Sequence, residues 1–131
     1  MEYTFSFEKL EVWKLARQFF KFTYSIIDNF PSFEKFNLVD QIRRASTSIV
    51  LNLAEGTSRH SLKEQAHFSE IAYGSTIEVY CAFLLAFDLE YIDENTMNEI
   101  ALRAKEISNK INALRNSQYQ RLESQQFNKQ Q

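Results

Sequence analysis

Residues 61–91 read SLKEQAHFSEIAYGSTIEVYCAFLLAFDLEY and carry two apolar series, each with the three- and four-residue steps of a helix face. The two series lie about 100° apart around the helix axis. The first series is mostly small and consists of Phe68, Ala72, Ser75, Val79, Ala82, Ala86 and Leu89. The second is mostly large and aromatic and consists of Tyr73, Ile77, Tyr80, Leu84, Phe87 and Tyr91. We therefore expect a helix that contacts more than one neighbour.

Signals for helix ends surround this segment. Ser61 and Glu64 have the spacing of a capping box, in which each side chain satisfies a free N–H at a helix start. Asp93 is a candidate N-cap for the following helix, and Pro31 ends an earlier one because proline has no N–H to donate. Gly56 is expected to close a helix in the left-handed conformation. Together with the apolar spacing, these signals predict helices over about residues 8–30, 38–56, 61–91 and 94–114.

Four amphipathic segments with short connections favour an all-α fold, an antiparallel up-down four-helix bundle. In the first helix, Trp13, Phe20 and Ile27 lie beside the core stripe and are expected to widen it. After Leu114 the chain becomes rich in Gln and Asn, with too few apolar residues to hold a packed position. We expect one bundle domain over residues 1–115 and a Gln-rich flexible C-terminal tail over residues 116–131.

The composition agrees with one cytoplasmic helical domain. The chain has 131 residues, of which 44% are hydrophobic and 24% charged, with only two Gly and one Pro. Sheets and long loops need more turn-forming residues, so an all-β fold is nearly excluded. No apolar run approaches the length of about 18 to 20 residues that a membrane span needs, and the N-terminus lacks the features of a signal peptide. The single cysteine, Cys81, forms no internal disulfide, which favours the cytoplasm.

Charge is segregated along the chain, although the net charge is only −2. Residues 64–99 contain acidic side chains and no basic ones, whereas basic residues predominate over residues 9–63 and 100–131. Blocks of opposite sign can form a local basic face, or they can let one subunit dock against another. Ordinary surface salt bridges are a third explanation, and they need no function.

Four basic residues around the second expected helix are candidate contacts for nucleic acid or a partner. Arg43 and Arg44 lie within the helix, and Arg59 and Lys63 follow just past its end. Arginines clustered in this way can bind phosphates. The alternative is structural, with Glu55 and Glu78 as candidate partners in polar pairs. An inter-helix pair between Glu78 and Arg43 or Arg44 is the simpler interpretation, since a buried carboxylate needs a partner.

No constellation of residues indicates catalysis. Glu64 and His67 have the Glu-x-x-His spacing of a di-iron bundle, but such a site needs a second copy, and the other histidine is His60. Cys81 lies four helical turns beyond His67, which does not resemble a nucleophile and its base. Two glycines cannot form a phosphate-binding loop. We expect no enzyme, no metal and no cofactor. An enzyme or metal carrier is a third hypothesis, because Glu64, His67 and Glu70 share a helix surface.

An ordered set of short motifs resembles the bacterial 23S rRNA intervening-sequence protein family, also called the four-helix bundle protein family, whose biochemical role is not established. The resemblance covers about residues 5–115. Its motifs are Phe7-Glu-Lys-Leu-Glu-Val-Trp13-Lys-Leu-Ala16, Phe30-Pro31, Gln41-Ile-Arg-Arg-Ala45, Ser48-Ile49, Asn52-Leu-Ala-Glu-Gly56, and Ala72-Tyr-Gly-Ser75 with Glu78.

The resemblance implies a left-handed four-helix bundle that assembles into a ring-like homopentamer. The chain is also similar to the accessory protein of diversity-generating retroelements, a basic pentamer that binds nucleic acid and a reverse transcriptase. Two hypotheses follow. In the first, a non-enzymatic oligomer presents its four basic residues to RNA, DNA or a nucleic-acid-bound protein. In the second, the protein is a structural or protein-interaction oligomer without nucleic-acid binding. Twelve Phe, six Tyr and one Trp favour a homo-oligomer under both hypotheses, because leftover apolar faces mark interfaces.

Overall fold

The computed structural model describes residues 2–130, and within them the chain forms four α-helices, two short 3-10 helices and no strand. The predicted all-α class with four helices is confirmed. The elements in chain order are η1 (Ser6–Lys9), α1 (Glu11–Ile27), η2 (Ser32–Glu34), α2 (Leu38–Thr57), α3 (Leu62–Asp88) and α4 (Glu94–Gln130).

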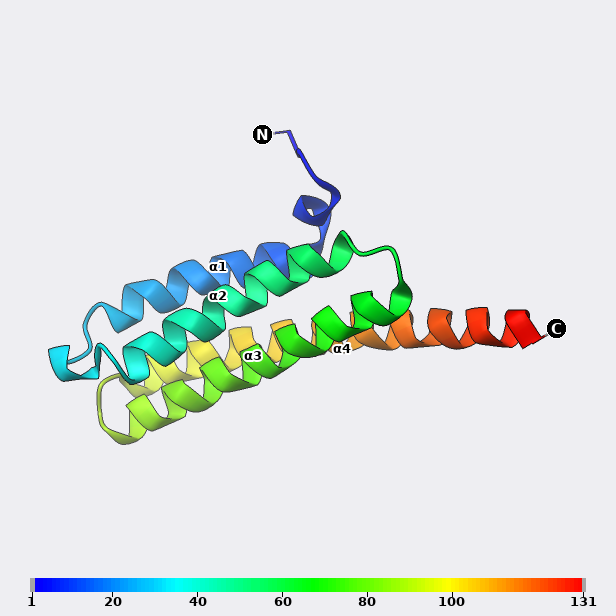
Figure 1. Ribbon diagram of the computed structural model, residues 1–131. Coiled ribbons are helices and arrows are strands. Elements are labelled where there is room, and N and C mark those ends of the chain that lie inside the picture. The colour runs from blue at the N-terminus through cyan, green and yellow to red at the C-terminus, as the bar shows by residue number, and fades with distance from the viewer. Residues whose placement is uncertain (1, 131) are drawn as a thin grey trace.

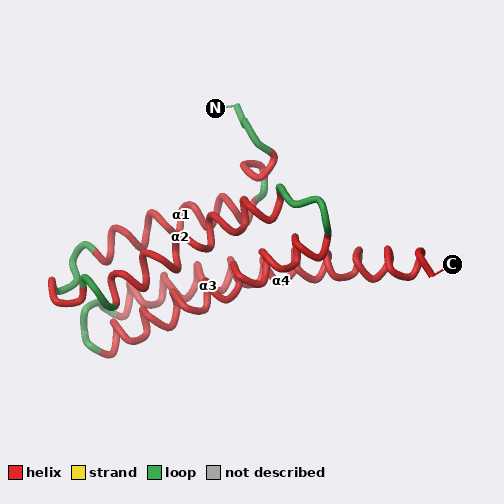
Figure 2. The backbone as a smooth tube through the Cα atoms, in the orientation of Figure 1, coloured by secondary structure: helices red, strands yellow, loops and turns green. Residues whose placement is uncertain are grey.

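The four helices form two layers, with α1 beside α2 and α3 beside α4 (Figure 1). Each helix contacts the next one along the chain, and α1 also contacts α4. The α1–α2 and α3–α4 connections lie at one end of the molecule, and the α2–α3 connection lies at the other (Figure 2). Among the described residues α1 makes no contact with α3, so these two helices lie diagonally across the bundle.

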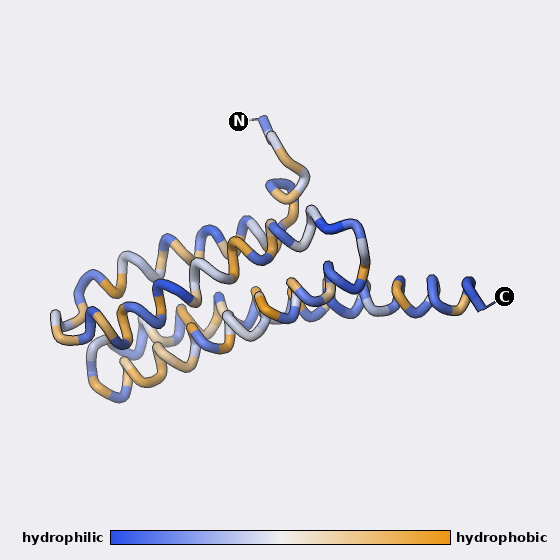
Figure 3. The backbone as a smooth tube through the Cα atoms, in the orientation of Figure 1, coloured by the Kyte–Doolittle hydropathy of each residue, from blue (hydrophilic) through white to orange (hydrophobic). Residues whose placement is uncertain are grey.

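Each helix buries one apolar stripe in a common core. The largest fully buried apolar side chains come from all four helices, and they are Phe19, Ile42, Ile49, Val79, Phe83, Ile100, Ile107 and Ile111. Figure 3 shows apolar residues recurring along every helix, whereas the end of α4 is mostly hydrophilic. Burial of these stripes, at roughly 25 cal/mol per Å² of apolar surface, is what holds the helices together.

The two apolar faces of α3 have different surroundings. Most of the small series is buried in the core, including Ala72, Val79 and Ala86. The large series is only partly covered, and Ile77 and Leu84 remain exposed. The prediction that α3 contacts two neighbours is confirmed, because it packs on both α2 and α4. The second face nevertheless leaves apolar surface exposed in the single chain.

One helix within residues 2–130, α3, is long and apolar enough to cross a membrane by length and composition alone, contrary to the expectation that no segment approaches this limit. A core helix of a bundle passes the same test, because it is apolar on more than one side. In this structure the core face of α3 packs on α2 and α4.

The helix starts follow the sequence signals more closely than the helix ends. The N-caps are confirmed: the Glu64 N–H donates to Ser61 Oγ (3.0 Å), and the Thr96 N–H donates to Asp93 Oδ1 (2.7 Å). Of the capping box expected at Ser61 and Glu64, only this Ser61 half is present among the described residues. The first helix is shorter than expected. It begins at Glu11, after the separate 3-10 turn, and ends at Ile27.

The interpretation of Gly56 as a left-handed helix terminus is wrong. Its φ is not positive, and it lies buried within the last turn of α2. A Cβ atom at this position would lie 3.1 Å from Phe68 Cβ, which is tighter than ordinary van der Waals contact. Gly56 therefore lets α2 and α3 approach closely beside the connection that joins them.

The expectation of a flexible tail over residues 116–131 needs correction, because α4 continues as a helix to Gln130. Gln118 is buried and accepts a hydrogen bond from Ser69 Oγ (2.7 Å). The Tyr119 hydroxyl donates to the Glu70 carboxylate, and this bond raises the pKa of the Tyr119 phenol. Beyond these contacts most side chains of α4 are exposed. Gln131 and Met1, which belonged to the expected tail and domain, lie outside the described residues.

Candidate nucleic-acid interface

The four basic residues singled out from the sequence do not form one surface. Arg43 and Arg44 are exposed in the first half of α2, and Arg44 forms an ion pair with Asp40 (Nε–Oδ2 3.1 Å). Arg59 follows the end of α2, and Lys63 lies in the first turn of α3. At a rise of about 1.5 Å per residue, roughly 20 Å of helix separates the two groups.

The contacts of Arg59 are structural. Its guanidinium pairs with the Glu55 carboxylate one turn earlier, and its Cζ lies 4.9 Å from the centre of the Phe68 ring. Through these contacts Arg59 links the last turns of α2 to the start of α3. Glu55 therefore pairs with Arg59, one turn further along the chain, and not across two helices as expected. Lys63 is exposed.

Glu78 is exposed on α3, and within residues 2–130 it forms no ion pair with Arg43 or Arg44. The expected inter-helix pair is therefore absent from the single chain. The nearest buried positions of α3 on either side of it, Thr76 and Val79, point to the core, and Glu78 lies outside this buried face. Gly74 and Cys81, which flank it on the same face, are exposed as well.

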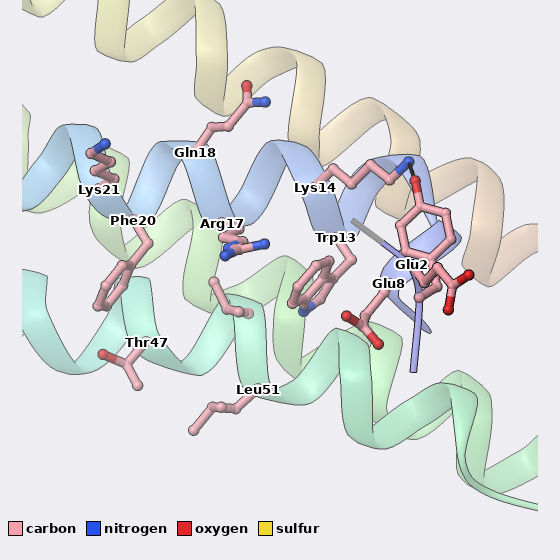
Figure 4. Close-up of a pocket in the computed structure, with 12 residues that line it drawn as sticks. Glu2, Glu8, Trp13, Lys14, Arg17, Gln18, Phe20, Lys21, Thr47 and Leu51 are labelled. Atoms are coloured by element: carbon pink, nitrogen blue, oxygen red, sulfur yellow. Dashed lines mark hydrogen bonds between the residues drawn. The ribbon is translucent and has the colours of Figure 1, made fainter. Parts of the chain in front are cut away.

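A groove of about 840 Å³ runs between α1 and α2 near the N-terminus (Figure 4). Its apolar part is formed by Trp13, Phe20, Val50 and Leu51, and the Leu51 side chain is 61% exposed although it is aliphatic. Lys14, Arg17 and Lys21 of α1 supply its cationic part.

Aromatic and cationic side chains alternate along the exposed edge of α1. The Arg17 Cζ lies 5.5 Å from the centre of the Trp13 ring, and the Phe20 and Tyr24 rings are 4.5 Å apart. At the N-terminal end Lys14 Nζ donates to Tyr3 Oη (2.6 Å). Arginine over tryptophan is a favourable cation–π contact that leaves other guanidinium N–H groups free to bind an anion.

The Trp13 indole contributes its ring to this groove. Its Nε1 is buried and has no acceptor among the described residues. Packing holds the ring in place, with the edge of Phe7 at a centroid distance of 4.9 Å.

A second hollow, of about 480 Å³, continues the groove along α2 and shares Thr47 and Leu51 with it. Arg43, Arg44 and Asp40 line it together with Tyr24. We call the combined surface the α1–α2 face. Its cations are Lys14, Arg17, Lys21, Arg43 and Arg44, and its apolar residues are Trp13, Phe20, Tyr24, Val50 and Leu51.

The α1–α2 face has an excess of positive charge. Three acidic residues, Glu2, Glu8 and Asp40, line it beside the five cations. Two of the three are engaged: the Glu8 carboxylate accepts the N–H groups of Thr4 (2.8 Å) and Phe5 (2.6 Å), and Asp40 pairs with Arg44. The acidic block of the sequence lies largely on α3 and its exit, and α3 does not contact α1 within the part of the chain that the structure describes.

Sequence reasoning missed the three cations of α1. Lys14, Arg17 and Lys21 recur at three- and four-residue steps beside Trp13 and Phe20, so the signal was present. Of the residues expected to widen the core stripe, Ile27 is buried in the core, and Trp13 packs against the core while it also lines the groove. Phe20 is partly buried and lines the groove.

A separate apolar groove of about 620 Å³ lies between α3 and α4. Tyr73, Ile77 and Tyr80 of α3 line it with Ala101 and Leu102 of α4. Leu102 is 65% exposed and Ile77 is 48% exposed. Exposed aliphatic side chains gathered in one groove are typical of an interaction surface.

Within residues 2–130, no group of three or more His, Cys, Asp and Glu side chains is placed to hold a metal ion. Glu64, His67 and Glu70 are all exposed on α3. The hypothesis of a metal carrier therefore gains no support from the geometry.

Comparisons with known proteins identify the family and the fold. The sequence model of the 23S rRNA-intervening sequence protein family matches residues 8–113. Among solved structures, the chain is similar to a protein of unknown function from the S23 ribosomal protein family of Bacteroides thetaiotaomicron VPI-5482. The TM-score is 0.71 at 22% identity, over 79% of this chain and 97% of that one. Among curated proteins no relative matches. The family match covers α1, α2, α3 and the part of α4 up to residue 113, and the chain therefore belongs to the 23S rRNA-intervening sequence protein family.

Proposed function

We propose that this protein is a non-enzymatic helical bundle that binds nucleic acid through the α1–α2 face. One observation carries the proposal: the cations of α1 and of α2 lie on one face, along two adjoining hollows that also contain aromatic side chains, although these cations are far apart in the sequence. Cations interleaved with aromatic rings provide both phosphate contacts and surfaces for bases.

The weak negative charge of the whole chain is compatible with such binding. Salt screens charges beyond about 8 Å at physiological ionic strength, so a phosphate responds mainly to the charges nearest to it. At the α1–α2 face these are five cations and three acids, an excess of two positive charges, with Arg44 paired to Asp40. If all five cations contact a single strand, log K falls with log salt at a slope of about −3.5, since each neutralised phosphate contributes about −0.7.

The test measures binding of the purified protein to labelled structured RNA and to duplex DNA across a salt series. The site variant is Arg17→Glu/Arg43→Glu, which reverses one charge on each helix of the α1–α2 face. The matched control is Arg59→Glu/Lys63→Glu, which makes the same charge change at the far end of α2. Circular dichroism verifies that both variants remain folded.

We expect the wild type to bind with an affinity that falls as salt rises, the site variant to lose binding, and the control to keep most of it. Loss in the control alone would move the site to the α2–α3 connection. Absence of wild-type binding even at low salt would refute nucleic-acid binding for this protein.

A structural or protein-interaction oligomer is the second candidate function, and the apolar groove between α3 and α4 favours it. The family resemblance implies a left-handed bundle and five copies in a ring-like homopentamer. The short connections favour an antiparallel up-down bundle in each copy. The composition favours the cytoplasm, where a nucleic-acid-bound protein is a further candidate partner. Light scattering tests the assembly. We expect an oligomer mass for the wild type and a smaller mass for Ile77→Asp/Leu102→Asp, whereas a wild-type monomer would refute assembly.

A further inference from the structure

We propose that the α1–α2 face takes single-stranded nucleic acid, with unpaired bases on its aromatic floor and phosphates on its cationic rim. This inference rests on the proposed function, and it names the class of nucleic acid that the same site binds.

The floor of the groove favours exposed bases. Trp13, Phe20, Val50 and Leu51 form an apolar surface recessed between two helices, within a volume of about 840 Å³. A duplex keeps the faces of its bases stacked inside and presents phosphates and base edges to a protein. An unpaired strand offers those faces for stacking on aromatic side chains. A single strand can therefore stack its bases on the aromatic rings of this groove, whereas the bases of an intact duplex cannot.

The order of aromatic and cationic side chains along α1 matches the alternation of bases and phosphates along one strand. Trp13, Arg17, Phe20, Lys21 and Tyr24 succeed one another along α1, over about 16 Å of helix. Arg43 and Arg44 continue the positive charge across α2. An acidic peptide would use only the cations, whereas a nucleic-acid strand brings phosphates to the cations and bases to the neighbouring rings, so the alternation favours a nucleic-acid strand.

Trp13 is the only tryptophan of the chain, and its fluorescence therefore reports on this groove directly. Three probes separate stacking from charge: a single-stranded oligouridine RNA of about 12 nucleotides, within the site sizes of single-strand-binding domains, its duplex with oligoadenosine, and an abasic oligonucleotide of the same length. We expect the single strand to quench Trp13 and to bind about tenfold more tightly than the abasic strand for each stacked base. The duplex is expected to bind more weakly and without quenching.

Phe20→Leu removes one ring and keeps the side chain apolar, and Phe36→Leu makes the same change at an exposed position outside the groove. We expect Phe20→Leu alone to reduce the preference for the single strand over the abasic strand. The single-strand inference would be overturned if the wild type bound all three probes equally. The proposed function would still stand in that case if Arg17→Glu/Arg43→Glu lost this binding. Tighter binding of the duplex would also overturn the inference. Absence of binding by every probe would overturn both.

Discussion

The two glycines of the chain give a matched test of helix packing, since both are helical but only one lies at a helix contact. A Cβ at Gly74 would meet no atom within 4 Å, whereas a Cβ at Gly56 would lie 3.1 Å from Phe68 Cβ. Replacing an exposed helical Gly by Ala stabilises a helix by about 0.5–1 kcal/mol. We therefore expect Gly74→Ala to raise the melting temperature by about 2–4 °C in a domain of this size.

Gly56→Ala has the same propensity gain but also a steric penalty. Phe68 Cβ is attached directly to the backbone of α3, so relief of the contact requires a shift of the helix. Overpacking of this kind costs about 1–3 kcal/mol. The melting temperature of Gly56→Ala should therefore lie about 3–10 °C below that of Gly74→Ala.

Thermal denaturation followed by circular dichroism, at one fixed protein concentration, measures both variants. Equal stabilisation by the two substitutions would refute the close approach of α2 and α3 at Gly56. A lower melting temperature for Gly74→Ala would mean that its face is covered, contrary to its exposure in the single chain.

Two further predictions concern α4. Gln118→Ala removes the inter-helix acceptor of the Ser69 hydroxyl, which keeps only the Gln65 carbonyl (3.2 Å), and this should destabilise the protein by about 0.5–1.5 kcal/mol, whereas Gln125→Ala at an exposed position changes stability by less than about 0.5 kcal/mol. Denaturant unfolding measures both, and equal stabilities would contradict the packed start of the C-terminal segment. The Thr96 N–H lowers the pKa of Asp93 below its ordinary value of 3.8, so the stabilising effect of Asp93 is complete above that value and disappears as pH falls through the lower folded-state pKa. Melting temperatures of wild type and Asp93→Asn should therefore converge in acid, and a difference independent of pH would refute the role of the charge.

Much of the fold was predictable because it depends on local patterns. The apolar spacing of α3 identified a helix with two faces, and the side chains of Ser61 and Asp93 marked the starts of two helices. These signals act within one or two turns of chain, where spacing determines which groups can meet.

The start of the C-terminal segment was missed because its packing is polar. Composition measures how much apolar surface a segment can bury, and this segment has little. Composition cannot show that Ser69 and Glu70 contact Gln118 and Tyr119, which are 49 residues further along the chain. Gln and Arg also favour helix by their intrinsic propensity, and this signal was available.

The candidate site was only half predictable for a similar reason. The sequence singled out Arg43 and Arg44, and it grouped them with Arg59 and Lys63 because all four lie close together in the chain. The structure groups the two arginines with Lys14 and Arg17 instead, because α1 and α2 pack side by side. Which helices become neighbours, and in what rotation, depends on the packing of the whole bundle.

Ultraviolet cross-linking of wild-type protein to a single-stranded RNA, with the attached peptides identified by mass spectrometry, tests the central claim most directly. It requires no substitution and reports where nucleic acid lies on the folded protein. The account predicts cross-links to α1 around Trp13 and Phe20. Cross-links confined to the α2–α3 connection around Arg59, or to the groove between α3 and α4, would contradict it.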